Sequence, residues 1–175
     1  IILFLIKMSK SIKLFLSGFF LVSLFGLVSF LQVRAASTAS VAATVTVQNI
    51  SVTVTDGAVA FGTLANNASA GTNGADTQTA TNNGNITEVL NIKGQNSTNW
   101  TLAATAGSDQ YVLKFCTATC TTPPTNYTAL TTNYQTLAAS VATSGTQTFD
   151  LYITTPNPST VYTQQSVDIT VQATQ

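Results

Sequence analysis

The stretch from Glu88 to Thr105 reads EVLNIKGQNSTNWTLAAT and contains the single tryptophan of the 175-residue chain. Before a polar turn, Leu90 and Ile92 alternate with polar residues. After it, Trp100 and Leu102 alternate with threonine and alanine. A period of two is typical of β-strands that bury one face. The pattern therefore predicts a β-hairpin whose tryptophan lies in the core, covered by further short strands.

Similar short runs occur through the rest of the chain. Asp56-Gly57 is a strong hairpin signal between two of them, and a change of phase at Gln48-Asn49 predicts a bulge or a break. Residues 66–85 have hardly a large apolar side chain and are predicted to be mainly an exposed loop, with at most a short edge strand near 77–81. The predicted strands are 41–47, 50–54, 58–64, 88–93, 100–104, 111–116, 137–141, 149–153 and 167–173. With no helical period beyond residue 36, this spacing predicts an all-β fold, an antiparallel β-sandwich of immunoglobulin-like or jelly-roll type.

The start of the chain has the three parts of a secretory signal peptide. Lys10 and Lys13 precede an apolar run over residues 14–31, which is followed by QVRAA. Small residues at positions −3 and −1 place the cleavage between Ala35 and Ala36. We therefore expect residues 1–35 to be a hydrophobic signal helix, the only contact with a membrane, and residues 36–175 to be a single exported domain.

Residues 1–7 precede Met8 and are expected to come from an over-extended reading frame. The apolar run is also long enough for an uncleaved anchor, which needs about 20 apolar residues. A type IV pilin leader, cut after Gly18, is a third interpretation, although Ser23 stands where such pilins usually carry glutamate.

The amino-acid composition limits the classes of function that the chain can have. Charged residues make up 7% of the chain, against roughly a quarter in ordinary globular proteins, and threonine and asparagine replace them. After residue 35 the chain carries two lysines and six acidic residues, a net charge of −4. Without a basic patch the chain is not expected to bind nucleic acid. The composition is that of a β-rich exported protein.

Few residues are of the types that catalyse reactions or bind metals. The chain has no histidine, which excludes His-dependent triads and the usual zinc sites. The acidic residues are scattered, and roles at turns are expected for residues such as Asp56 and Asp109. Cys116 and Cys120 are the only cysteines, and in an oxidising compartment they are predicted to form a structural disulfide. We therefore expect no enzymatic activity, no cofactor and no metal.

Three segments together resemble the WxL domain of bacterial cell-surface proteins. Phe61-Gly62 resembles an early Phe-Gly of that family, and Leu90 to Leu102 is similar to its first Trp-x-Leu motif. Phe149 to Thr170 is similar to the segment that leads into the last strand. The chain departs from the family in that last strand, which reads VDITV and lacks the second tryptophan.

The resemblance implies a secreted protein at the cell surface that adheres to peptidoglycan or to other surface proteins. Trp100 and Leu102 are then the candidate contact residues, with Tyr162 as a secondary one. Packing in the core is the alternative role for all three.

Two other functions are compatible with the sequence. The alternating segment Ser37 to Val47 could leave its own domain and complete the sheet of a neighbour, giving a surface filament assembled by donor-strand exchange. A carbohydrate-binding module would use Tyr127, Tyr134 and Tyr152 as stacking platforms.

Overall fold

The computed structural model describes residues 37–121 and 125–175, and these contain strands, turns and loops without any helix. The predicted signal helix and its cleavage site between Ala35 and Ala36 lie outside the described residues. Within those residues, no helix is long and apolar enough to cross a membrane. The chain divides into two compact units, Ile1–Val45 and Thr46–Gln175. In the first unit, the described residues 37–45 form no strand and are exposed.

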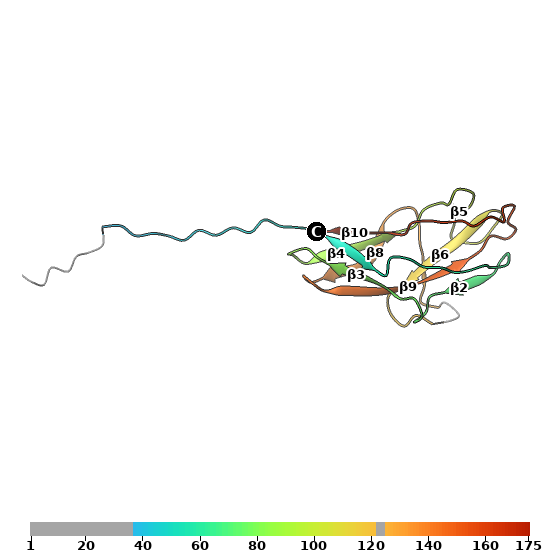
Figure 1. The fold of residues 1–175 in the computed structure, drawn as a ribbon, viewed down its shortest axis with the longest axis horizontal. Coiled ribbons are helices and arrows are strands. Elements are labelled where there is room, and N and C mark those ends of the chain that lie inside the picture. Colours follow the sequence, from blue (N-terminus) through green and yellow to red (C-terminus); the bar gives the residue numbers. More distant parts are fainter. Residues whose placement is uncertain (1–36, 122–124) are drawn as a thin grey trace, which may run out of the picture. The chain divides into compact units, whose positions relative to one another are not determined.

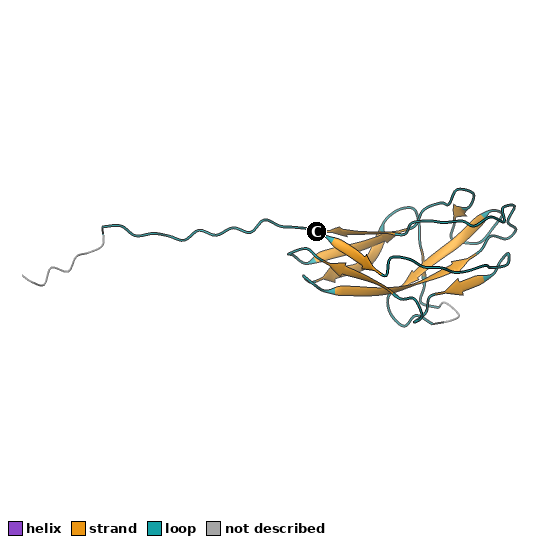
Figure 2. Ribbon diagram, in the orientation of Figure 1, coloured by secondary structure: helices purple, strands orange, loops and turns teal. Residues whose placement is uncertain are grey.

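The second unit is built from two β-sheets (Figures 1 and 2), so the predicted all-β class is confirmed. The larger sheet has the order β1–β3–β9–β6–β5, with β2 beside β9 and β7 beside β6. The smaller sheet has the order β10–β4–β8. The strands are β1 (Val52–Thr55), β2 (Ser69–Gly71), β3 (Gln78–Asn82), β4 (Glu88–Lys93), β5 (Thr101–Leu102), β6 (Gln110–Cys116), β7 (Thr128–Ala129), β8 (Gln135–Val141), β9 (Thr146–Thr154) and β10 (Thr170–Thr174).

One apolar cluster holds the two sheets together. On β4 every second residue is buried, so Leu90 and Ile92 point to the same side. They belong to the same cluster as Leu113 of β6 and Leu151 of β9, which lie in the other sheet. Full burial of such a side chain contributes about 1.5–3 kcal/mol. The long strands β6, β8 and β9 lie where the alternation of the sequence predicted them.

The predicted hairpin around Trp100 is wrong. β4 pairs with β10 and β8, whereas β5 belongs to the other sheet and pairs with β6. The two-residue β5–β6 pair is parallel, whereas the other strand pairs in the described residues are antiparallel as predicted. Local hydrogen bonds turn the chain between the sheets: Ser97 N–H donates to the Trp100 carbonyl, and Leu102 N–H donates to Asn96 Oδ1. Trp100 itself is only half-buried, at the edge of the core.

The predicted loop over residues 66–85 is only partly correct: it contains β2, which was not predicted, and β3 forms where a short edge strand was predicted but lies inside the sheet. β3 lies between β1 and β9 and is buried along one face. Its buried polar side chains are satisfied by hydrogen bonds: Asn82 Nδ2 donates to the carbonyls of Ile86 and Val141, and Gln78 Oε1 accepts from Gly57 N–H. The lack of large apolar residues in this segment predicted a loop. Hydrogen bonds of buried polar side chains hold the strand in place instead.

Three other predicted strands are missing or shortened. The chain turns at Asp56-Gly57, where Gly57 has a φ of 81°, but residues 58–64 form no strand, and β1 pairs with β3 instead. Residues 41–47 form no strand, and β10 begins at Thr170 rather than Val167. As a result, β1 and β10 are edge strands, each bordered by a segment without strand structure.

Candidate functional site

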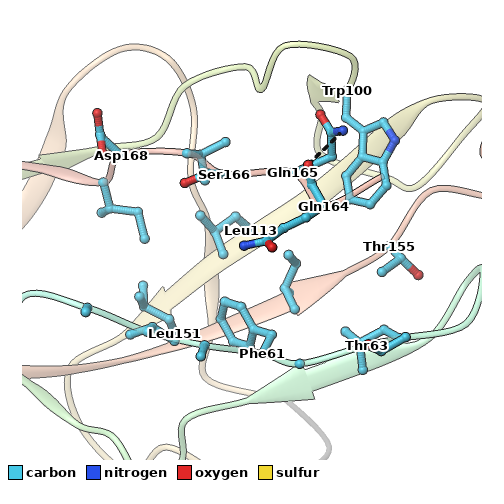
Figure 3. Close-up of a pocket in the computed structure, with 18 of the residues that line it drawn as sticks. Phe61, Thr63, Trp100, Leu113, Leu151, Thr155, Gln164, Gln165, Ser166 and Asp168 are labelled. Atoms are coloured by element: carbon cyan, nitrogen blue, oxygen red, sulfur yellow. Dashed lines mark hydrogen bonds between the residues drawn. The ribbon is translucent and has the colours of Figure 1, made fainter. Parts of the chain in front are cut away.

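A large groove opens along these two segments (Figure 3). It has a volume of about 1030 Å³, above the roughly 300–1,000 Å³ of small-molecule pockets. Residues 57–64, which follow β1, form one wall, and residues 161–169, which precede β10, form the other. In Figure 3, Phe61 lies on the first wall and Asp168 on the second, with Leu113 of β6 between them. The groove therefore reaches the main core.

Most of the backbone in the two walls of the groove has no neighbouring strand. Neither residues 59–64 nor residues 163–168 make a backbone–backbone hydrogen bond in the part of the chain that the structure describes. Their side chains nevertheless alternate, with Val167 and Ile169 half-buried and Asp168 exposed. Backbone groups of a strand-like segment without a ladder partner form a template for pairing with another strand.

The apolar lining is only partly covered. Most of the half-buried apolar residues that pack on the core lie in this groove rather than elsewhere on the surface. They are Val54, Val59, Phe61, Trp100, Ile153, Val167, Ile169 and Val171. A contiguous apolar surface of this kind typically marks an interaction site.

The groove carries almost no charge. Among its described lining residues, Asp168 is the only charged one. Gln164, Gln165 and Ser166 supply polar groups on the same wall. A neutral, apolar partner that can hydrogen-bond suits this lining, whereas an anion such as a phosphate does not.

Hydrogen bonds fix Trp100 at one end of the groove. Its indole Nε1 donates to Ser159 Oγ at 3.1 Å, and Ser159 Oγ donates to the carbonyl of Val161 at 2.7 Å. The Tyr111 ring lies 6.3 Å from the indole ring, between centroids. Burial raises the pKa of Tyr111 to about 12, so its hydroxyl stays protonated and donates to the Gln95 carbonyl. The indole is therefore held as part of a rigid rim.

Asp109 ties the same rim to β6. Its Oδ2 accepts from Thr160 Oγ1 at 2.6 Å, and its Oδ1 accepts from Thr160 N–H at 2.7 Å. The hydrogen bonds from the Thr160 hydroxyl and backbone, and a weaker one from Ser159, lower the pKa of this carboxyl. The backbone of Asp109 has a φ of 54°, which Asp and Asn tolerate better than most residues. Asp109 lies in a turn as predicted, but its carboxylate binds Ser159 and Thr160, far along the chain, rather than the local backbone.

The structure brings together two of the three predicted contact residues. Trp100 and Tyr162 both line the groove, and Tyr162 is 81% exposed. Leu102 does not line it and instead lies against Gly94, where any side chain would collide with it.

The three tyrosines proposed as a carbohydrate platform do not form one surface. Tyr127 and Tyr152 pack against each other, with ring centroids 5.6 Å apart. Tyr134 lies elsewhere, beneath Lys93 Nζ at 4.7 Å. Burial, and then the charge of Asp150, raises the pKa of Tyr127.

Cys116 and Cys120 form the predicted disulfide. The prediction that acidic residues lie mostly at turns fails for two residues in strands. Glu88 of β4 is buried and accepts from Ser51 N–H, and Asp150 of β9 is buried and accepts from the hydroxyls of Thr72 and Thr77. Within the described ranges, no cluster of three or more acidic or cysteine side chains could hold a metal ion.

The N-terminal segment, taken by itself, has a distinctive composition and exposure. Its valines Val41, Val45 and Val47 are 93%, 91% and 80% exposed, and among the large apolar residues of the described chain only Tyr162 has a comparable value. The sequence of residues 37–47, STASVAATVTV, contains no charge and alternates apolar and polar residues over its second half. It offers a strand-forming segment that is not used within the fold.

No protein-family model, curated protein or solved structure matches this chain. The function therefore has to be inferred from the groove and the N-terminal segment alone. The sequence predicts residues 58–64 as the second strand of a hairpin, so it does not indicate that they form the wall of a groove. The period-two pattern shows that a segment can be a strand but does not show whether it has a partner.

Proposed function

We propose that this chain is the structural subunit of a surface filament that assembles by donor-strand exchange. Residues 37–47 of one copy fill the groove of the next copy. One observation carries the proposal: the same chain contains an uncovered apolar groove and an unused alternating segment of matching character. On this proposal the two sheets are a β-sandwich that lacks one strand along its β1–β10 side, and the neighbouring copy supplies that strand.

The dimensions of the two parts agree. A strand rises about 3.3 Å per residue, so residues 41–47 extend over roughly 23 Å. The wall formed by residues 57–64 extends over roughly 26 Å by the same measure. A groove of this length is suited to an extended peptide rather than a compact ligand.

The chemistry agrees as well. An inserted strand can hydrogen-bond to the backbone of residues 59–64 and 163–168, which has no backbone partner in the described chain, and this gives affinity while alternate side chains enter the apolar lining. Val41, Ala43 and Val45 share one parity and would face inward together. The segment has no charge to bury, which fits a lining with Asp168 as its only charged residue.

Electron microscopy of the chain from Ala36 onward, compared with the same chain lacking residues 36–47, tests the proposal. We expect filaments from the longer chain and folded, non-assembling protein from the shorter one. If the shortened chain remains folded and polymerises as before, strand exchange is wrong.

Attachment to the cell wall is a second candidate, favoured by the exposed ring of Tyr162 beside the groove that Trp100 also lines. In this case the export implied by the signal-like start would deliver a WxL-like adhesive domain to peptidoglycan. Sedimentation of the folded protein with purified peptidoglycan, with Trp100→Phe for comparison, tests it. Failure of the folded wild-type protein to sediment with the wall would reject this function.

A further inference from the structure

Asn85 connects the turn between β3 and β4 to Val47, the last residue of the donor segment, and to Asn49 just after it. Its side-chain Nδ2 donates to the Val47 carbonyl at 2.8 Å, and its Oδ1 accepts from Asn49 N–H at 2.8 Å. Its backbone N–H donates to the Asn49 carbonyl at 3.1 Å. The amide side chain thus binds residues 47–49 as a neighbouring strand would.

The same pattern continues toward β1. Asn83 N–H donates to the Ser51 carbonyl at 2.8 Å, and Ser51 N–H donates to Glu88 Oε1 at 2.8 Å. The groups that are held belong to residues 47, 49 and 51, which is the alternation of an extended strand edge. Residues 47–51 are therefore fixed in an extended conformation before β1 begins.

These hydrogen bonds determine whether the donor segment can fill the groove of its own subunit or only that of another subunit. For residues 41–47 to fold back beside β1 of their own chain, the chain would have to reverse within residues 48–51, a loop length that hairpins commonly use. The hydrogen bonds of Asn85 to both sides of Gln48 are incompatible with that reversal. Self-complementation is excluded as long as they persist.

We infer that Asn85 is a positioning residue that prevents a subunit from filling its own groove and so directs its donor segment into a second copy. The inference rests on the proposed strand exchange. It predicts that loss of the Asn85 side chain releases residues 47–49, allows the hairpin, and produces closed monomers that no longer assemble.

The test compares Asn85→Ala with Asn83→Ala in the chain from Ala36 onward. Asn83 lies in the same turn and donates its side chain to Thr53 Oγ1 at 2.8 Å, so its removal also costs a hydrogen bond near β1 without touching residues 47–49. Two side-chain hydrogen bonds are lost in Asn85→Ala, so the ratio of closed monomer to filament should rise about 5- to 150-fold. Asn83→Ala should behave as the wild type does.

Hydrogen exchange of residues 41–47 in the monomer fraction separates this role from simple destabilisation. Protection of that segment in the Asn85→Ala monomer supports the inference, because a merely loosened turn would leave the segment unprotected. Equal filament yields from both variants, or an unprotected segment in the monomer of Asn85→Ala, would overturn it. If the wild type forms no filaments at all, the proposed function fails instead.

Discussion

Replacing Val45 with aspartate should abolish filament assembly without disturbing the folded subunit. Val45 is 91% exposed, so its side chain contributes almost nothing to the stability of its own domain. Exposed substitutions usually change the free energy of unfolding by no more than about 0.5 kcal/mol. Any large effect of this change must therefore come from the assembled state.

The magnitude follows from the burial that the exchange requires. Moving a valine side chain from water into the groove is worth about 1.5–3 kcal/mol. Since about 1.4 kcal/mol corresponds to a factor of ten, loss of this contribution alone weakens the contact between subunits about 10- to 150-fold. The aspartate adds the cost of an unpaired carboxylate in an apolar site that already contains Asp168, so the combined loss is larger still.

Thr44→Asp is the matched control. It introduces the same charge one residue away, also at an exposed position, but on the opposite face of the strand. Sedimentation over a range of concentrations, with electron microscopy of the pellet, should show filaments for the wild type and Thr44→Asp but none for Val45→Asp. Equal assembly by the two aspartate variants would refute the inward orientation of Val45 and with it the fit of donor to groove.

Three further predictions concern the subunit itself. Replacing Cys116 and Cys120 by serine should lower the free energy of unfolding by about 2 kcal/mol in urea titrations, since the closed loop is short. Gly84→Ala should destabilise the fold by about 1–3 kcal/mol in the same assay, because a Cβ there would overlap Glu88 Oε1 and the Asn49 carbonyl. The pKa of Asp109 is lower in the folded state than its unfolded value of about 3.9, so the ionised carboxylate stabilises the fold above that pH. This stabilisation is lost as the pH falls through the folded-state pKa. The unfolding free energies of the wild type and Asp109→Asn should therefore differ most at neutral pH and converge below about pH 4; a constant difference would contradict this.

The sequence predicted those parts of the fold that depend on local alternation. The strands β6 and β9 have apolar residues at regular spacing, and the pair Cys116 and Cys120 offers a single possible disulfide. Strand β3 was predicted only as a short edge strand, because its buried Gln78 and Asn82 are satisfied by partners far along the chain, which no local pattern reports.

The candidate site could be predicted only in part. Trp100 and Tyr162 were identified, but the groove was not, because the lack of a pairing partner for residues 58–64 is a property of the whole fold. Asn85 gave no signal of its own in a chain so rich in asparagine. The alternation of residues 37–47 favours strand donation, which stays a prediction.

The most direct test is a cryo-electron microscopy reconstruction of the assembled chain that begins at Ala36. We expect extended density for residues 41–47 of one subunit in the groove of the next, between residues 57–64 and 161–169, with Val45 facing Leu113. An assembly whose grooves are empty, or are filled by the same subunit's own segment, would contradict the account.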